Sequence, residues 1–489
     1  MRFPHRHVLS PVVASLFVAC AGADRPLTPH LPPPSAAAAD VQTANRWLVL
    51  FHDERVPSAF ADRVASLGGR VDESLDEIGV ATVSGLSSDA LAALSADEDV
   101  QTIEARDAPA SEVSDLTEDV PAAAADVHAL PRDASGLPSP TLATLYPRQW
   151  NLRAVDADDA WAAGYLGWDQ ARVAIMDTGI DYLNPELEGL VDLTSSRSFS
   201  NDDALTSTLY PDRAPFTDLF WHGTANASLV SSTAKQLAGV NQQVTLFAVK
   251  VGNAAGNAAT DAFAAIYWAV KQRADVMSFG GGVQVDSARQ PALAAAYFRA
   301  FEYAWRKGAV SVGPAGDNGR NRDLNRAQHL LGIPCDAPHA ICVSLTAPTA
   351  DAPLTGPWTN VDAIQPTNNY GSVITVAAPG GSRFTNTRIW LTCTTSPGPS
   401  APSTCKPGAP YTGLVQGVGT SWSSATVAGL AAALVTKYGH NHADLIRQRI
   451  IDSADDLGAP GWDPYYGWGR INVARALEVP IRRGRDSGQ

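Results

Sequence analysis

The chain has 489 residues, with 45% hydrophobic and 18% charged residues and a formal net charge of -14 at pH 7. A chain of this length and composition can bury a large core in more than one domain. The acidic balance argues against a nucleic-acid partner, because that function requires a basic surface. The only basic cluster, at 482–485, lies in the C-terminal tail and is typical of a solvated chain end.

The first 20 residues have the pattern of an export signal. Basic residues at the start precede an apolar run from Val8 to Ala19, which is too short to span a bilayer. The run ends at Cys20 in a context that resembles the cleavage box of bacterial lipoproteins, although Phe17 stands where that box prefers leucine. Cleavage at small residues a little downstream also fits. We therefore expect an exported protein, either secreted or anchored to the cell envelope or outer membrane through a lipidated Cys20.

Residues 21–45 are rich in proline and alanine and predict a disordered spacer. The composition changes at Arg46, where a small α+β domain of residues 46–106 begins, and Ser87 has the character of a helix N-cap. Residues 107–146 are rich in Ala, Pro, Asp and Ser and predict an exposed linker with a processing site. The strands expected in the small domain are 47–51, 78–83 and 100–104, and the helices are 56–67 and 87–93.

The large domain is expected at 147–478, followed by a tail at 479–489. Apolar strand patterns alternate along it with helical patterns, which indicates an α/β fold with a parallel sheet covered by helices on both faces. The expected strands are 172–176, 245–251, 275–279, 309–313 and 340–345, and the clearest helices are 157–163, 259–272 and 290–307.

Apart from Cys20, the chain has four cysteines, an even number that an exported protein can oxidise to disulfides. Closeness in sequence suggests the pairs Cys335–Cys342 and Cys393–Cys405, and the other pairings stay open. No spacing in the chain matches a zinc site, so we expect no metal there.

Three segments carry residues of the kinds used in nucleophilic catalysis. Asp177 ends an apolar strand, and His222 opens a predicted helix. Ser421 follows a glycine and opens a long run of small and aliphatic residues, with Gly439 as its stop signal. A helix N-terminus favours developing negative charge, which suits an acyl-transfer nucleophile. Taken alone, Ser421 is more typical of an N-capping serine on a buried, alanine-rich helix.

Together these motifs resemble those of the subtilisin-like serine proteases. The aspartate motif is Asp177-Thr-Gly-Ile-Asp, the histidine motif is His222-Gly-Thr, and the serine motif is Gly-Thr-Ser421, in the order Asp, His, Ser. The likeness covers roughly residues 149–477. It implies a doubly wound, mostly parallel sheet with helices on both faces. Supporting stretches are 246–251, 274–281, 376–380 and 465–472.

The resemblance implies an endopeptidase that hydrolyses peptide bonds through an acyl-enzyme. Ser421 would be the nucleophile, His222 the general base and acid, and Asp177 the group that orients the imidazole. The domain at 46–106 resembles the inhibitory propeptide of this family, which implies a zymogen. The expected partners are protein or peptide substrates and the chain's own propeptide, and no cofactor is required.

Two further segments resemble parts of the family's substrate site. Ser278, Phe279 and Gly280 resemble the strand that lines the first substrate pocket and pairs with the substrate backbone, with a weak hint of apolar or aromatic preference. In the segment that resembles the oxyanion hole, Asp317 stands where the family has an asparagine donor, and Asn318 follows one residue late. We expect a protonated Asp317 to donate there; Asn318 or backbone donors alone are the alternatives.

The sequence departs from the family pattern at several positions. Ala225 and Asn184 stand where histidines are common, and the bulky Trp422 follows the nucleophile. The loop that binds calcium in the family is shortened to 231–236 and lacks carboxylates, so calcium is not supported there. The acidic stretch 201–203 is expected to be a solvated loop rather than a metal site.

These departures leave two other functions open. A catalytically silent subtilisin-like domain could serve in binding, although such a domain has no need of three intact triad residues. A non-proteolytic esterase would share the triad but would lack an extended substrate groove.

Overall fold

The structure is a computed structural model that describes residues 46–106, 110–111, 116–118, 138–257, 262–406 and 413–482. For 110–111 and 116–118 only the backbone is described. The predicted signal sequence with Cys20, the spacer and most of the linker lie outside the described residues. Within these ranges no helix is long and apolar enough to cross a membrane.

The small N-terminal domain has a four-stranded antiparallel sheet in the order β2-β3-β1-β4. Its helices pack their apolar residues against one face of this sheet. Ser87 caps the second helix by accepting the Ala90 N–H at 3.2 Å, as predicted. The elements are β1 (Arg46–Phe51), α1 (Phe60–Ser66), β2 (Arg70–Leu75), β3 (Val80–Ser84), α2 (Ser88–Ser95) and β4 (Val100–Ala105).

Strand β2 was absent from the sequence prediction. It is an edge strand, and most of its residues are polar and at least partly exposed, so it carries no run of apolar residues. Sequence patterns detect buried strands better than such edges.

The large domain is built on an eight-stranded sheet in the order β15-β14-β12-β10-β7-β9-β8, with β16 beside β14. All pairs in it are parallel except β14–β15, which confirms the predicted α/β class. The strands are β7 (Arg172–Asp177), β8 (Arg197–Ser198), β9 (Thr245–Lys250), β10 (Val276–Phe279), β12 (Val310–Pro314), β14 (Ile341–Ala347), β15 (Ala363–Ile364) and β16 (Ile374–Pro379).

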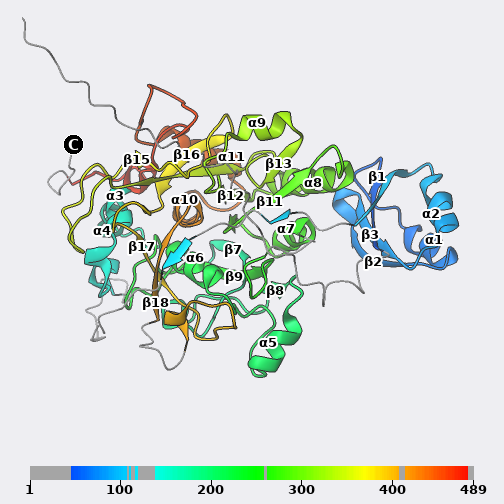
Figure 1. Ribbon diagram of the computed structural model, residues 1–489, viewed down its shortest axis with the longest axis horizontal. Coiled ribbons are helices and arrows are strands. Elements are labelled where there is room, and N and C mark those ends of the chain that lie inside the picture. Colours follow the sequence, from blue (N-terminus) through cyan, green and yellow to red (C-terminus); the bar gives the residue numbers. More distant parts are fainter. Residues whose placement is uncertain are drawn as a thin grey trace, which may run out of the picture. The chain divides into compact units, whose positions relative to one another are not determined.

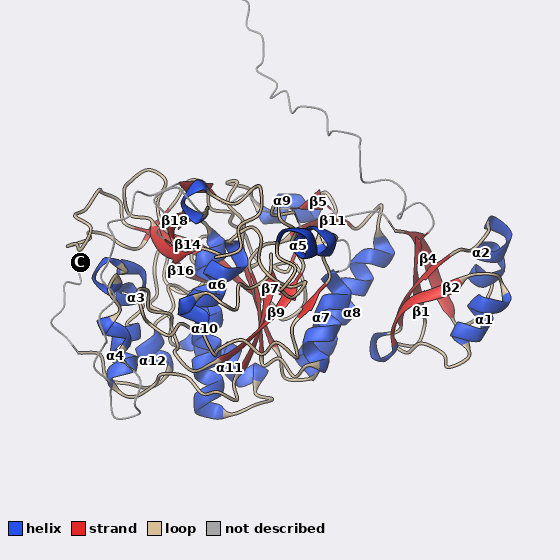
Figure 2. Cartoon of the chain, turned by 90° about the horizontal axis from the view of Figure 1, so that it is seen from below, coloured by secondary structure: helices blue, strands red, loops and turns tan. Residues whose placement is uncertain are grey.

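Helices cover both faces of this sheet (Figure 2). Val173 and Ile175 of β7 point into the cluster that contains the central helix, whereas Ala174 and Met176 point into the cluster on the other face. On the first face lie α6 (His222–Val230), α10 (Thr420–Tyr438) and α11 (Ala443–Asp452), together with the small helices α3 (Trp150–Ala154), α4 (Ala157–Ala162) and α12 (Val473–Ala476); on the second lie α7 (Ala262–Lys271) and α8 (Pro291–Arg306).

Helix α10 runs through the middle of the large domain, beside α6 and β12 (Figure 1). Its first sixteen residues are buried, which explains why small residues dominate its sequence. Gly429, for example, has the Val240 side chain 2.7 Å from where a Cβ would stand. The nucleophile candidate therefore lies at the start of a deeply buried helix.

Two three-stranded sheets and two surface helices complete the described residues. One sheet has the order β13-β11-β5 and the other β17-β18-β6, so strands from the predicted linker join both. The elements are β5 (Ala110–Ser111), β6 (Leu116–Glu118), α5 (Asp203–Leu209), β11 (Val283–Asp286), α9 (Arg322–Ala327), β13 (Leu330–Ile333), β17 (Ile389–Thr392) and β18 (Leu414–Val418).

The packed part of the large domain begins before residue 147. Ala143, Leu145 and Tyr146 are buried in it, although composition assigned them to the linker. The structure also contains both of the suggested disulfides, with Cα–Cα distances of 4.8 Å for Cys335–Cys342 and 5.5 Å for Cys393–Cys405.

Candidate active site

The three candidate catalytic residues come from the ends of three elements. Asp177 is the last residue of β7, His222 is the first of α6, and Ser421 is the second of α10. The carboxyl ends of parallel strands face the amino ends of the helices that follow, so this edge of the sheet gathers them. Gly223 permits the approach of α6, because a Cβ there would stand 2.1 Å from the Gly179 carbonyl oxygen.

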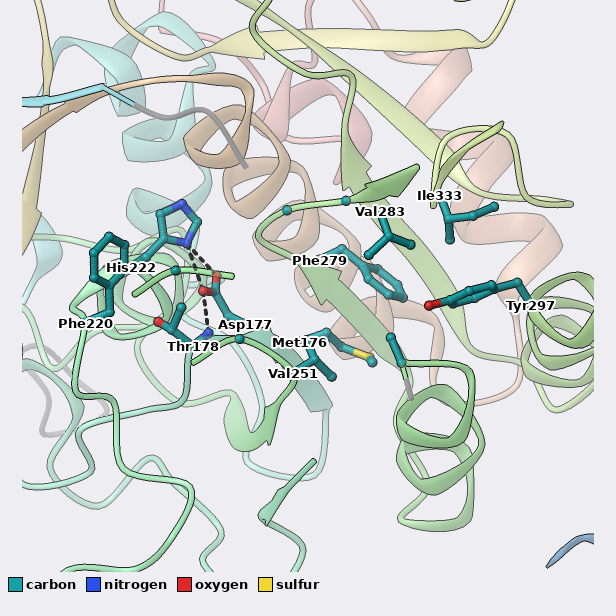
Figure 3. Close-up of a pocket in the computed structure, with 15 residues that line it drawn as sticks. Met176, Asp177, Thr178, Phe220, His222, Val251, Phe279, Val283, Tyr297 and Ile333 are labelled. Atoms are coloured by element: carbon teal, nitrogen blue, oxygen red, sulfur yellow. Dashed lines mark hydrogen bonds and ion pairs between the residues drawn. The ribbon is translucent and has the colours of Figure 1, made fainter. Parts of the chain in front are cut away.

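Asp177 and His222 form a buried pair (Figure 3). The His222 Nδ1 lies 2.8 Å from one carboxylate oxygen of Asp177 and 3.0 Å from the other. The carboxylate also accepts the Thr178 N–H at 2.6 Å and the Asn226 side-chain amide at 2.7 Å. These donors hold the carboxylate in a fixed orientation toward the imidazole.

Gly280 connects Ser421 to the Asp177–His222 pair. The Ser421 hydroxyl donates to the Gly280 carbonyl oxygen, and a Cβ on Gly280 would stand 1.7 Å from the Asp177 Oδ2. Trp422, the next residue after Ser421, lies against the imidazole of His222, with 4.8 Å between the ring centroids. The structure thus brings Asp177, His222 and Ser421 together at one edge of the sheet.

The departure at Trp422 has a structural explanation. Its indole is fully buried and also packs against Trp221, with the ring centroids 5.3 Å apart. It supports the face of His222 and is not among the residues that line the neighbouring pocket.

Asp218 organises the turn before His222, and sequence reasoning missed it. Its fully buried carboxylate accepts the Phe220, Trp221 and Thr224 N–H groups, each at 2.9 Å. Burial raises the pKa of this carboxyl, and the hydrogen bonds from Thr224 oppose that rise. Trp221 has φ 135°, a conformation that a non-glycine residue rarely adopts, and the surrounding contacts hold it. An aspartate four residues before the histidine motif is the only sequence signal for this role.

An apolar pocket opens beside the Asp177–His222 pair (Figure 3). Phe279, one of the predicted substrate residues, lines it, and Gly280 lies between the pocket and Ser421. Ser278 differs from expectation: it pairs with Ile175 on one side and Val312 on the other, inside the sheet. The other apolar side chains that line the pocket are Met176, Phe220, Val251, Ala262, Val283, Tyr297 and Ile333.

Asp317 lies at the amino end of α10. Both of its carboxylate oxygens accept the Thr420 N–H, at 3.0 and 3.1 Å, and one also accepts the Thr420 hydroxyl at 3.0 Å. Asn318 is exposed. The contribution of Asp317 or Asn318 to an oxyanion hole stays a prediction, and we return to it in the Discussion.

The shortened loop 231–236 folds around a carboxylate. Glu186 is buried and accepts the Ser232 hydroxyl at 2.8 Å and the Lys235 and Gln236 N–H groups at 3.2 and 2.7 Å. Burial raises the pKa of Glu186, and these hydrogen bonds oppose the rise. This carboxylate is thus engaged by hydrogen-bond donors, and in the described ranges no cluster of three or more His, Cys, Asp or Glu could hold a metal ion.

The structure also shows the contacts of Asn184 and of the acidic stretch 201–203. Asn184 donates to the Thr392 hydroxyl and the Cys393 carbonyl, so it ties the turn after β7 to β17. The prediction that 201–203 forms a solvated loop was wrong for Asp202, which is buried and pairs with the fully buried Lys250 at 2.9 Å. A buried ammonium requires such a counter-charge, and sequence gives no sign of so distant a pairing.

Comparison with known proteins identifies the family. Residues 169–469 match the subtilase family (Peptidase_S8). Subtilisin DY of Bacillus licheniformis is 28% identical over 337 residues, which are 67% of this chain and 98% of that protein. Thermitase of Thermoactinomyces vulgaris is 29% identical over 335 residues, 68% of this chain and 96% of that protein.

Solved structures show the same fold. The epidermin leader peptide processing serine protease of Staphylococcus aureus has a TM-score of 0.65 at 18% identity and covers 90% of this chain and 99% of its own. Fervidolysin of Fervidobacterium pennivorans has a TM-score of 0.63 at 20% identity, over 90% of this chain and 61% of its own. The chain therefore belongs to the subtilase family and is a subtilisin-like serine endopeptidase.

Proposed function

We propose that the chain is an exported endopeptidase, made as a zymogen, that cleaves peptide bonds with Asp177, His222 and Ser421. The observation that carries the proposal is the buried Asp177–His222 pair, with Gly280 packed against Asp177 and its carbonyl accepting the Ser421 hydroxyl. A serine hydroxyl is a weak nucleophile, so it requires a base that is itself held in one tautomer.

In the proposed mechanism each group has one role. Asp177 accepts the Nδ1–H of His222, so Nε2 is the nitrogen that would take the Ser421 proton as the oxygen attacks the peptide carbonyl. His222 then protonates the leaving amine, and water releases the acyl group in a second cycle. The amino end of α10 supplies N–H groups and a favourable dipole for the oxyanion.

The pocket indicates the substrate class. Its walls are apolar and include Phe279 and Tyr297, so we expect preference for a peptide with a large apolar or aromatic side chain near the scissile bond. The backbone of Ala110–Ser111 pairs antiparallel with Val283 and Gln284 at the pocket's edge. This pairing supports an edge that binds extended peptides by strand addition, which an esterase would not need.

The contacts of the N-terminal domain support a zymogen. The described residues belong to one compact unit, and the side chains of Leu48 and Leu50 share a buried cluster with α7 and α8. Arg299 of α8 donates to the Phe51 and Gly79 carbonyls, both at 2.9 Å. From this anchored domain the chain continues to Ala110–Ser111 beside the pocket, where a substrate would bind.

Casein hydrolysis tests the catalytic proposal. The matured protein should cleave casein, and Ser421→Ala should reduce the rate at least a thousandfold, on the scale of triad removal. A folded, matured protein that hydrolyses a small ester but not casein would instead identify an esterase. One that hydrolyses neither would identify a silent binding domain.

Export and lipidation have their own test. Cells that express the full chain are fed an alkyne fatty acid, and the chain is compared with Cys20→Ser. Label that disappears in Cys20→Ser would establish an anchored lipoprotein, whereas unlabelled protein in the medium would establish secretion. Retention of the uncleaved chain in the cytoplasm would contradict export.

A further inference from the structure

Asn226 is a buried residue beside the catalytic pair that the sequence motifs do not single out. It lies one turn after His222 on α6 and is 1% exposed. Its side-chain nitrogen is 2.7 Å from the Asp177 Oδ2 and 3.2 Å from the His222 Nδ1. Asn226 and His222 therefore donate to the same carboxylate, which also accepts the Thr178 N–H.

The side-chain oxygen of Asn226 differs from the nitrogen in its contacts. The Asn226 Oδ1 is buried and lacks a hydrogen-bond partner among the described residues. An unsatisfied buried oxygen destabilises the folded state, so an apolar residue of the same size would suit packing at least as well. Gly280 adds a second sign, because a Cβ on it would stand 2.8 Å from the Asn226 nitrogen. The same Cβ would stand 1.7 Å from the Asp177 Oδ2, so Gly280 permits the close packing of both groups.

We propose, on the basis of the triad function above, that Asn226 is a positioning residue that fixes the Asp177 carboxylate toward His222 and offsets part of its charge. A carboxylate with a second donor attracts a neighbouring imidazolium less strongly. His222 therefore loses its proton at lower pH and remains a free base over a wider range. The residue acts through Asp177 and need not touch the substrate.

Other charges near the pair stay in place when Asn226 is changed. Asp218 faces Asp177 from the turn before α6 and is held by N–H groups of that turn. Lys250 of β9 is opposite Asp177 in the sheet, but its ammonium pairs with Asp202. A change in the titration of His222 on substitution of Asn226 can therefore be assigned to the lost donor.

The test compares Asn226→Leu and Asn226→Asp with Ser228→Ala in the matured protein that is obtained from the full-length chain. Asn226→Leu removes the donor at similar size, and Asn226→Asp keeps the shape but adds a negative charge beside Asp177 when the new carboxyl is ionised. Ser228 is a matched control, because it is buried on the same helix and its hydroxyl bonds only the Ala225 carbonyl. We expect kcat to fall about ten- to a hundredfold for both Asn226 variants, with KM within about twofold, as for loss of one hydrogen bond to a charged group.

The pH dependence separates positioning from simple structural support. The acid limb of kcat/KM should move to higher pH in both Asn226 variants and stay fixed in Ser228→Ala. The same shift should appear in the NMR titration of ¹⁵N-labelled His222 in a Ser421→Ala background, which does not depend on activity. Loss of kcat without a shift in either measurement would overturn the inference, as would unchanged kcat.

The NMR arm also keeps this inference distinct from the proposed function. If the wild-type protein proves inactive, a shifted His222 titration still supports the role of Asn226, and an unshifted one overturns it.

Discussion

At the scale of single residues, we expect Asp317 to influence how the oxyanion is stabilised. Its carboxylate lies at the amino end of α10 and accepts the Thr420 N–H. An ionised carboxylate cannot donate to an oxyanion, whereas a protonated one can. Asp317→Asn supplies a permanent donor, so we predict that it retains or raises kcat and extends activity to higher pH. The measurement is the pH profile of kcat on a peptide substrate.

Asn318 provides the matching variant. It is exposed and one residue further along, so Asn318→Ala should leave kcat nearly unchanged. If Asp317→Asn leaves the pH profile as it was and Asn318→Ala costs about a hundredfold, then Asn318 is the donor and the assignment of Asp317 is one residue off.

The sequence motifs predict the residues that react but not those that hold them. Asp177, His222 and Ser421 stand in recognisable triplets, so a single sequence suffices to nominate them. Asn226 and Asp218 act only because α6 and the turn before it fold against β7, and no local pattern reports that. The pairing of Asp202 with Lys250 likewise depends on two segments that only the fold brings together.

At the scale of elements, a partly buried carboxyl group at the start of α4 makes the stability of the fold depend on pH. Asp156 precedes α4 with φ 55°, accepts the Asn472 amide at 2.8 Å, and has its pKa raised by burial to about 6. A carboxyl with a raised pKa favours folding below its unfolded pKa, and that stability is lost as pH rises through about 6. Asparagine also adopts this backbone conformation and keeps an acceptor for Asn472.

Asp156→Asn should therefore stabilise the protein at pH 8 by about 1 kcal/mol, after allowance for partial solvent exposure, and have little effect at pH 4. Thermal unfolding at the two pH values checks this. Asp212→Asn, in an exposed loop, serves as the control. Equal shifts at both pH values would show that charge burial is not the cause.

Helices and strands could be predicted from the sequence where their residues form buried apolar runs. The buried strands β7, β9, β10, β12 and β14 read as apolar runs, and each was predicted to within a few residues. The polar edge strand β2 carries no such run, and β5 and β6 exist only by pairing with strands far along the chain.

At the scale of the whole molecule, Arg299 is the main polar anchor between the N-terminal domain and α8. It donates to backbone carbonyls of two turns in that domain and to the Gln101 side chain at 2.7 Å. Arg299→Ala should weaken the interface and raise the activity of the unprocessed chain about tenfold or more. Arg289→Ala, which removes an exposed arginine outside this interface, should not. Activity on a fluorogenic peptide before maturation measures both; equal values would argue against inhibition by this domain.

Maturation provides a second prediction at this scale. The linker 107–146 connects the two folded domains, so we expect the mature N-terminus within it. Ser421→Ala should accumulate as the full-length chain when purified, because self-cleavage requires the nucleophile. N-terminal sequencing follows the cut, and normal processing of purified Ser421→Ala would show that another protease makes it.

The most direct measurement of the central claim is labelling of the matured protein with a fluorophosphonate probe, followed by mass mapping. The account predicts one labelled peptide that contains Ser421, with labelling abolished in Ser421→Ala and in His222→Ala. A folded, matured protein that takes up no label, or takes it up at a residue other than Ser421, would contradict it.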